Sequence, residues 1–332
     1  MPSPVPLQLM HKEGAGEMTV PDELRFDGRV AIVTGAGRGL GESHARYLAA
    51  RGARVVVNDV GTSLTGHGHD EQVAKTAAES IRELGGEAIA HSGDIADEDQ
   101  CRELVDLALE EYGRLDIVVH NAAIERLAPL AEVTRRDILD HLEPDVLAAV
   151  TLSQLAWPVF ESQHYGRLVL TSSTAYFGGA SSLSYVISKA ATVSLGRSLG
   201  QLSEKTDSDI KVNVIAPHGL TRMVDKGYAN RPEDLAVRRK HVSSHYTSAV
   251  VALLAHEACP ANAELLQCAA GGVRRIFIGA GQGWQDPELT PETLLANWSS
   301  ADQIGDWEVI TGGSTENFDK YFGHLLETRN RT

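Results

Sequence analysis

The sequence predicts an α/β fold: one doubly wound, parallel sheet of seven strands, with helices on both faces and a C-terminal extension. Three observations lead to it. Short runs rich in Val and Ile alternate with longer segments of helical periodicity. The central residues of these runs are mostly apolar, as in strands that are buried on both faces. A glycine-rich turn follows the first run directly. Right-handed connections between parallel strands then make the sheet doubly wound.

The expected elements follow one another in a regular order. Strands are expected at Val30–Thr34, Arg54–Asp59, Glu87–His91, Asp116–His120, Arg167–Thr171, Ile210–Ala216 and Glu264–Cys268. Helices are expected near 40–51, 71–84, 98–112, 134–163, 184–203 and His245–His256. Strict alternation of this kind predicts that each helix crosses from one parallel strand to the next.

The α/β domain accounts for most of the chain. We expect a flexible tail at 1–24, the domain at 25–280, and an extension at 281–332 that packs on the same domain or on a partner subunit. Within the extension, helices are expected at Pro291–Asn297, where Thr290 is the N-cap, and near Asn317–Leu326.

Composition excludes several classes of function. The net charge of −15 makes nucleic acid a poor partner, because Lys and Arg contacts to phosphate dominate that affinity. The first residues lack the apolar segment of a signal peptide, and no apolar run is long enough to cross a bilayer. Cys101, Cys259 and Cys268 have no CxxC spacing, so we expect free thiols in a reducing compartment, the cytoplasm. The GHGHD segment at 66–70 resembles a metal ligand set, but we expect a solvated loop and no metal.

The turn after the first strand has the composition of a phosphate cradle. Glycines let the backbone approach a pyrophosphate, and a helix N-terminus offers unpaired N–H groups and the positive end of its dipole. The spacing is TGxxxGxG rather than GxGxxG. The candidate cofactor contacts in this turn are Gly35, Gly37, Arg38, Gly39, Leu40 and Gly41.

Asp59, at the end of the second strand, indicates which dinucleotide is bound. A carboxylate at this position accepts both ribose hydroxyls of an adenosine and repels a 2′-phosphate. Arg38 favours the opposite choice, because a basic residue in the glycine turn attracts that phosphate. Asp59 has more weight, since Val60 follows it where an NADP site often carries a basic residue. We therefore predict NAD as the cofactor.

Tyr185 and Lys189 form a candidate proton-transfer pair. Their spacing of four residues places both side chains on one face of a helix. A free tyrosine, with a pKa of about 10, is a poor base at neutral pH, and a neighbouring ammonium group favours its phenolate. The spacing alone also fits an ordinary helix, so the assignment depends on the preceding strand end, LTSS.

The chain resembles the short-chain dehydrogenase/reductase family. The resemblance rests on TGxxxGxG after the first strand, HNAA at 120–123 after the fourth, and SYVISK downstream of LTSS, and it runs from about Phe26 to Met223. Further stretches, such as NVIAPHGLTRM and LLAHEACPANAELLQCAAGGV, resemble members that oxidise (3R)-hydroxyacyl-CoA. The resemblance implies a Rossmann fold, and hydride transfer that interconverts a secondary alcohol and a ketone.

The resemblance also implies roles for individual residues. Tyr185 would be the acid/base, and Lys189 would lower its pKa and bind the nicotinamide ribose. Thr221 would anchor the carboxamide of the nicotinamide. The other cofactor contacts would come from Asp94, Ile95, Asn121, Ala122, Ala123, Pro217 and Gly219.

The substrate oxygen would be held by Ser172 or Ser173. The usual spacing of 13 residues before the tyrosine selects Ser172, whereas alignment of the strand GRLVLTSS selects Ser173. We favour Ser173, because strand register is more constrained than loop length.

Several positions depart from the family pattern, among them His218 where the family has the glycine of a Pro-Gly pair. Asp145 stands where the family has an asparagine whose main-chain carbonyl holds a water in the proton relay, and this carboxylate can perturb Lys189. A surface acid is an equally weighted interpretation of Asp145. Pro144 predicts a bend or break in the helix. His120 and Ala123 stand in HNAA where the family has NNAG.

The substrate and the partners are left with alternatives. A (3R)-hydroxyacyl-CoA is implied, and Val237–His241 or Arg274–Arg275 would then meet the CoA phosphates. A steroid or other hydrophobic alcohol is the alternative, because an acidic surface disfavours polyanionic CoA. A non-catalytic NAD-binding sensor is a third, motivated by Asp145 and Ala123. We expect a homodimer or homotetramer.

Overall fold

One eight-stranded sheet forms the centre of the protein. The computed structural model describes residues 23–179, 182–218, 230–281, 283–286, 288–301 and 307–310. The strands are β1 (Val30–Thr34), β2 (Arg54–Asn58), β3 (Glu87–His91), β4 (Ile117–His120), β5 (Tyr165–Thr171), β6 (Asp209–Pro217), β7 (Leu265–Ala269) and β8 (Gly272–Ile276). Their order is β3-β2-β1-β4-β5-β6-β7-β8. The first seven are parallel, which confirms the predicted sheet, and β8 is an antiparallel addition beside β7.

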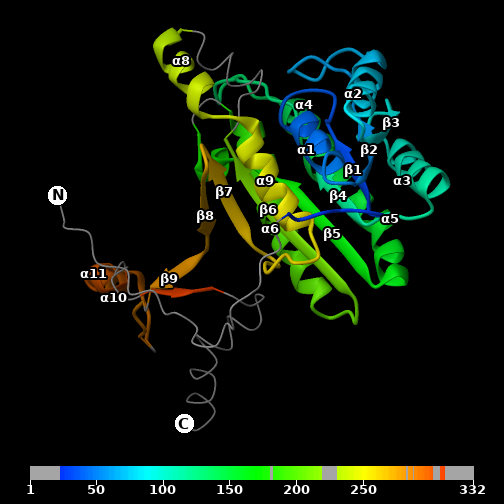
Figure 1. Cartoon of the computed structure of the whole chain (residues 1–332). Coiled ribbons are helices and arrows are strands. Elements are labelled where there is room, and N and C mark those ends of the chain that lie inside the picture. The colour runs from blue at the N-terminus through cyan, green and yellow to red at the C-terminus, as the bar shows by residue number, and fades with distance from the viewer. Residues whose placement is uncertain are drawn as a thin grey trace.

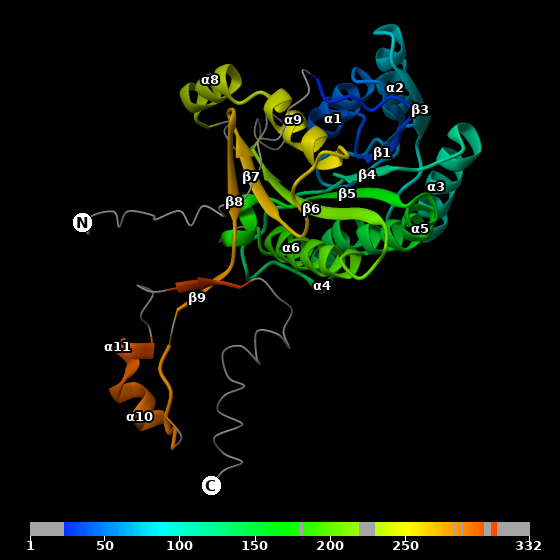
Figure 2. The same cartoon turned by 60° about the horizontal axis from the view of Figure 1, so that its bottom comes forward.

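Helices cover both faces of the sheet (Figures 1 and 2). One face is covered by α1 (Gly39–Ala49), α2 (Gln72–Glu83) and α9 (Ser244–Ala255), and the other by α3 (Glu98–Tyr112), α5 (Ala148–Gln163) and α6 (Leu183–Ser203). The helix α8 (Pro232–His241) precedes α9 and was not predicted. The helices predicted from the sequence for these two layers are confirmed, and most of their observed ends lie within two residues of the predicted ones.

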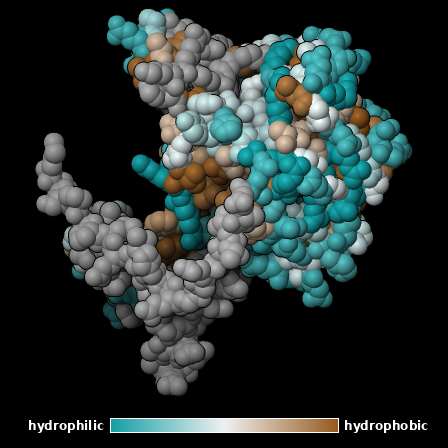
Figure 3. Space-filling model, in the orientation of Figure 1, coloured by the Kyte–Doolittle hydropathy of each residue, from teal (hydrophilic) through white to brown (hydrophobic). Residues whose placement is uncertain are grey.

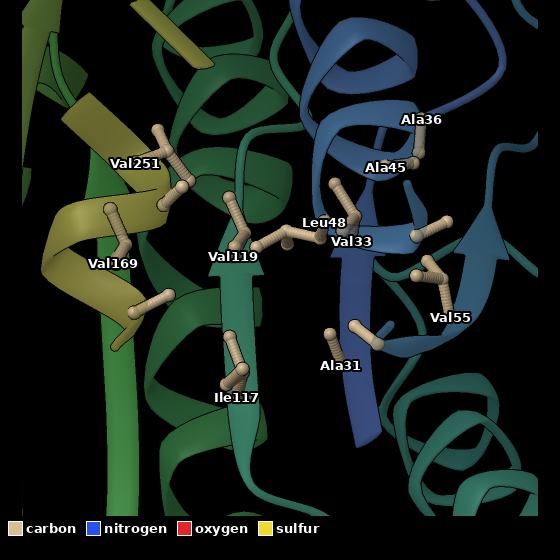
Figure 4. Packing of buried hydrophobic residues seen from close by; sticks show 14 of the residues in the cluster. Ala31, Val33, Ala36, Ala45, Leu48, Val55, Ile117, Val119, Val169 and Val251 are labelled. Atoms are coloured by element: carbon tan, nitrogen blue, oxygen red, sulfur yellow. The ribbon is translucent and has the colours of Figure 1, made fainter. Parts of the chain in front are cut away.

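The continuous apolar strands are explained by these two layers. Along β1, Ala31 and Val33 belong to the cluster under α1 and α9, which Figure 4 shows, whereas Val30 and Ile32 belong to the cluster on the opposite face. Side chains alternate between the faces of a strand, so every position must be apolar when both faces are covered. Burying one such aliphatic side chain contributes roughly 1.5–3 kcal/mol.

The helix expected over 134–163 is interrupted in its middle. It consists of α4 (Arg135–Leu142), a π-helical segment η1 (Glu143–Leu147), and α5. Pro144 has no N–H to donate into an α-helical ladder, and Ala148 N donates to Glu143 O, five residues back. The wider turn places Asp145 inside the protein, 1% exposed. The interpretation of Asp145 as a surface acid is therefore wrong.

The C-terminal segment lies away from the layers of the sheet (Figures 1 and 2). It contains an antiparallel pair, β9 (Gly279–Gly281) and β10 (Trp307–Val309), and the short helices α10 (Pro291–Ala296) and α11 (Trp298–Ala301). The predicted α10 is confirmed, with a capping box between Thr290 and Thr293. Most of the predicted N-terminal tail, and the helix expected near 317–326, lie outside the described residues. The three-part division of the chain stays a prediction.

The surface beside this segment is partly apolar. Figure 3 shows hydrophobic surface around β7 and β8, where Val273, Phe277 and Ile278 are each more than 40% exposed. None of the described helices combines the length and hydropathy that a membrane-spanning helix needs.

Candidate active site

A cleft of about 860 Å³ opens at the carboxyl ends of the central strands. From β1 the chain builds the sheet outward through β2 and β3, and from β4 it builds in the opposite direction. Ligands of doubly wound sheets bind at such a reversal. The predicted site residues that line the cleft are Gly35, Arg38, Gly39, Leu40, Asp59, Asp94, Ile95, Asn121, Ala122, Ala123, Ser173, Tyr185, Lys189 and Pro217. Gly219 and Thr221 lie outside the described residues.

The glycine turn is closely packed from behind. A Cβ on Gly41 would lie 2.2 Å from the Gly35 carbonyl oxygen, and one on Gly37 would lie 2.3 Å from a Val73 methyl group. These two predicted residues do not line the cleft but permit the turn that does. Arg38, the N-cap of α1, makes no side-chain capping bond. The free first turn of this helix fits the pyrophosphate of a dinucleotide.

Asp59 is held between two backbone turns. Gly37 N donates to Asp59 Oδ2 at 2.9 Å, and Gly61 N donates to Asp59 Oδ1 at 2.8 Å. An ionised carboxylate has about four acceptor positions, so both oxygens retain capacity for the hydroxyl groups of a ribose. The remaining acceptor positions of Asp59 fit the hydroxyl groups of a dinucleotide ribose.

Thr34 joins the ends of β1 and β4, and sequence reasoning did not single it out. Its Oγ1 accepts the N–H groups of Asn121 at 3.0 Å and Ala122 at 3.1 Å. The Asn121 amide donates to the carbonyl oxygens of Thr34 and Gly35. Asn121 therefore orients the glycine turn, and Ala123 follows it in the cleft wall. The signal was present, because Thr34 opens the TGxxxGxG motif.

The structure brings Ser173, Tyr185 and Lys189 together, as predicted. Tyr185 is half-buried and is hydrogen-bonded to Ser173, and Lys189 Nζ lies 5.4 Å from the centre of the Tyr185 ring. Burial raises the pKa of Tyr185, while the Lys189 ammonium and the bond from Ser173 lower it. Asp145 and Glu125 raise it further, because negative charge disfavours the phenolate. Tyr185 and Lys189 therefore have the mutual placement expected of a proton-transfer pair.

The two candidate serines have different surroundings. Ser172 also lines the cleft, but it is almost completely buried and its hydroxyl group donates to the main-chain oxygen of Lys189 at 2.7 Å. Ser173 accepts a bond from Ala175 N at 3.2 Å and is the serine that bonds Tyr185. This geometry favours Ser173 as the group that holds the substrate oxygen, which stays a prediction.

Lys189 is buried and anchored on two sides. It is 2% exposed, its Nζ donates to Thr171 O at 3.0 Å, and it forms an ion pair with Asp145 Oδ2 at 3.2 Å. Ser188 also donates to Asp145 Oδ2, at 2.6 Å. Asp145 thus reaches the site through Lys189 and does not line the cleft.

Two histidines near the site were not assigned a role from the sequence. His120 Nε2 bonds the main-chain oxygen of Asp145 at 3.2 Å. The ring of His141 lies edge-on to Tyr185 with a centroid distance of 6.4 Å. His141 also accepts a bond from Arg126 N at 3.2 Å. None of these three contacts could be read from the sequence, because each depends on how the chain folds back.

Arg274 and Arg275 do not line the cleft. No group of three His, Cys, Asp or Glu side chains with the geometry of a metal site occurs in the described parts of the chain. Arg275 forms an ion pair with Glu264 beside β7. Side chains at 238–241 are not among those described.

Comparison with known proteins agrees with this geometry. Residues 29–231 match the family model described as short chain dehydrogenase. The chain belongs to the short-chain dehydrogenase family. It is accordingly an oxidoreductase, and members of the family bind NAD or NADP. The family expected from the motifs is confirmed.

Several relatives are long, multifunctional proteins. The chain is 32% identical over 292 residues to the peroxisomal hydratase-dehydrogenase-epimerase of Saccharomyces cerevisiae, and covers 31% of that protein with 86% of its own length. It is 32% identical over 284 residues to the peroxisomal multifunctional enzyme type 2 of Drosophila melanogaster, with 84% of this chain and 46% of that one covered. The structure of the full-length Drosophila enzyme matches 93% of this chain and 50% of that one with a TM-score of 0.72 and 26% identity. The chain therefore spans less than half the length of both curated relatives.

A shorter relative matches over nearly its whole length. The 7alpha-hydroxysteroid dehydrogenase of Escherichia coli K12 is 33% identical over 264 residues, which cover 77% of this chain and 98% of that one. A solved 7 alpha-hydroxysteroid dehydrogenase with NADH and 7-oxo glycochenodeoxycholic acid matches 75% of this chain and 95% of that one, with a TM-score of 0.65 and 30% identity.

Proposed function

We propose that the protein is an NAD-dependent dehydrogenase that oxidises a (3R)-hydroxyacyl-CoA, and thus works in lipid metabolism. The arrangement of Ser173, Tyr185 and Lys189 in one cleft is the observation that carries the reaction type. The similarity to multifunctional peroxisomal enzymes over 84–88% of the chain supports the substrate class.

The residues of this chain divide the work of an alcohol oxidation among them. Bound NAD supplies the acceptor for the hydride. Ser173 donates to the substrate oxygen, and Tyr185, as a phenolate, accepts the hydroxyl proton. Lys189 stabilises that phenolate by its charge. Asn121 and Thr34 hold the glycine turn in the geometry that a dinucleotide needs.

Asp59 supports NAD rather than NADP. Its carboxylate is fixed by two backbone N–H groups and lines the cleft beside Arg38. A 2′-phosphate placed against it would meet a negative charge at short range. Asp59→Ser should therefore raise kcat/KM for NADP relative to NAD, measured as a ratio with one substrate. An unchanged ratio would contradict this use of Asp59.

A hydrophobic alcohol such as a steroid is the second candidate substrate. It is supported by the charges in the outer part of the cleft, where Arg126 and Arg136 both form ion pairs with Asp140. Glu125 and Glu143 also line this part. A polyanionic CoA gains little from cations that are already paired.

The deciding measurement is NADH formation by the purified protein. A medium-chain (3R)-hydroxyacyl-CoA, its free acid and a panel of hydroxysteroids would be tested in parallel, with Tyr185→Phe as the control. Turnover of the CoA ester alone supports the proposal, and turnover of steroids alone selects the second candidate. Binding of NAD without turnover of any alcohol would favour the third hypothesis, a non-catalytic NAD-binding sensor.

We also propose that the protein forms a homodimer or homotetramer and acts in the cytoplasm. The exposed apolar residues near β8 support self-association, because large apolar patches on a surface commonly mark interfaces. Sedimentation equilibrium of the purified chain and imaging of a tagged full-length chain test these two statements.

A further inference from the structure

Two departures from the family pattern contact each other. His120 ends β4, Asp145 lies in η1, and His120 Nε2 is 3.2 Å from the main-chain oxygen of Asp145. A carbonyl oxygen only accepts hydrogen bonds, so Nε2 carries the proton. Nδ1 then accepts from the Thr34 hydroxyl group at 3.3 Å, whose oxygen already receives two backbone N–H groups. Burial lowers the pKa of His120 to about 4, which keeps this imidazole neutral.

The main-chain carbonyl of Asp145 thus accepts a hydrogen bond from His120, whereas the side chain of Asp145 contacts other groups. The carboxylate is almost completely buried, and its Oδ2 receives Ser188 Oγ at 2.6 Å and faces Lys189 Nζ at 3.2 Å. Its Oδ1 has no hydrogen-bond partner among the described residues. A buried carboxylate is costly unless a charge compensates it. Lys189 supplies that compensation.

Lys189 is held by the same contacts. Its ammonium group has three donors, of which one points to Thr171 O and another to Asp145. The group that faces Tyr185 is consequently a buried ion pair rather than a lone cation. The field of an ion pair at a third group is weaker than that of its cation, because the two charges oppose each other.

We propose that Asp145 is a positioning residue that acts on Tyr185 through Lys189. Its carboxylate fixes the ammonium group and cancels part of its field at the phenol, and this moves the working range of the enzyme to higher pH. His120 holds the π-helical turn that presents the carboxylate. The kinetic consequence rests on the proposed oxidation, whereas the effect on the phenol does not.

The other groups around Tyr185 do not replace this effect. Lys189 is the cation that lowers the pKa of Tyr185, and the negative charges that raise it are Asp145 and Glu125. His141 lies edge-on to the ring from α4. Ser173, after β5, contributes an uncharged hydrogen bond. Removal of the Asp145 charge therefore leaves Glu125 as the negative charge that opposes Lys189 at Tyr185 among the described residues.

The first test measures the phenol directly, without cofactor or substrate. The chain has eight tyrosines, so the tyrosinate absorbance of Tyr185 is taken as the difference between each protein and its Tyr185→Phe counterpart. It is compared at the highest pH at which circular dichroism shows all proteins folded. We expect Asp145→Asn to contain more Tyr185 phenolate than the parent, corresponding to a midpoint about one pH unit lower. Equal fractions would overturn the proposal.

Two variants separate charge from structure. Asp145→Glu keeps the charge and should keep the parent's fraction of phenolate. Asp116→Asn removes a different buried carboxylate, which pairs with Arg29 and Arg114 at the opposite end of the sheet. It should leave the fraction of Tyr185 phenolate unchanged. A shift of the same size in all three variants would mean that general loosening of the fold is responsible.

The second test uses a medium-chain (3R)-hydroxyacyl-CoA and NAD. The rising limb of kcat/KM against pH should move down by about one unit in Asp145→Asn and stay in place in Asp145→Glu. A lower kcat in both variants with unmoved limbs would indicate a purely structural role and overturn the proposal. Absence of turnover in every protein, together with the tyrosinate shift, would reject the proposed function and retain the role of Asp145.

Discussion

Two buried carboxylates lie near opposite ends of β4, and they are satisfied differently. Asp116 precedes the strand, and both its oxygens are bound by Arg29 and Arg114, with Val30 N as a further donor at 2.9 Å. Asp145 lies beyond the other end of the strand, where its main-chain oxygen contacts His120, and only one of its two carboxylate oxygens has a partner in the described structure.

The difference indicates that the carboxylate at the amino end of β4 contributes to stability, whereas the one at the carboxyl end belongs to the surroundings of the cleft. At the amino end four hydrogen bonds satisfy the carboxylate of Asp116: Arg29 and Val30 N join it to the start of β1, and Arg114 binds it from the same loop. At the carboxyl end, Asp145 Oδ1 has no hydrogen-bond partner in the described structure, and the cleft opens nearby. Doubly wound folds place their ligands at this end. Substitutions at the two ends should therefore affect different quantities.

The largest effect is expected at the carboxyl end. Tyr185→Phe removes the hydroxyl group to which we assign the proton transfer, and kcat should fall roughly 10⁴-fold. The melting temperature should change little, because the aromatic ring and its contacts remain. Steady-state kinetics and differential scanning calorimetry measure the two quantities. Activity equal to that of the parent would show that SLSYVISKA is an ordinary helix.

The amino end should respond in stability instead. Asp116→Asn leaves two arginines beside a neutral amide, which should lower the free energy of unfolding by about 3 kcal/mol. The kcat of the folded protein should be retained. Urea titration and kinetics at low temperature measure this. A variant with full stability and reduced kcat would erase the distinction between the two ends.

His44 is a third buried titratable group, and desolvation is the cause of its shifted pKa. Burial lowers the pKa of His44 from 6.5 to about 3, and its Nδ1 is 2.8 Å from Ser248 Oγ. Below pH 6.5 the unfolded chain binds a proton that the folded chain does not bind, so stability falls as pH falls. Through His44, the free energy of unfolding falls by about 1.4 kcal/mol for each pH unit below 6.5. His44→Asn should make the acid side of the stability profile shallower by that amount, as measured by urea titration from neutral to mildly acidic pH.

The smallest effect is expected from one arginine of the amino-end cluster. Arg114 is 37% exposed, and Arg29 remains to pair with Asp116 after Arg114→Met. We expect a loss of less than about 1 kcal/mol, because water screens exposed ion pairs. Asp116→Asn measured in parallel is the matched control. A loss as large as that of the control would mean that Arg114 carries the whole pair.

Local patterns were sufficient for most of the sheet and for the glycine turn. The seven parallel strands have mostly apolar central residues, and a glycine-rich turn between a strand and a helix is typical of a dinucleotide site. The strand β8 was missed because its pairing with β7 is a tertiary contact, and its residues are mostly exposed. The reversal between them places Ala270 and Gly271 at positive φ. An exposed edge strand has no continuous apolar run to reveal it.

The sequence by itself determined the order of the elements, the glycine-rich turn after β1, and the placement of Tyr185 and Lys189 on one face of a helix, because each depends on neighbours a few positions away. Only the tertiary structure decided what Asp145 does. A missing N–H at Pro144 was visible in the sequence, but the direction in which the widened turn points depends on His120, which lies 25 residues away along the chain. Contacts of that separation are set by how the sheet is assembled, so they determine the electrostatics of Tyr185 without leaving a pattern in the sequence.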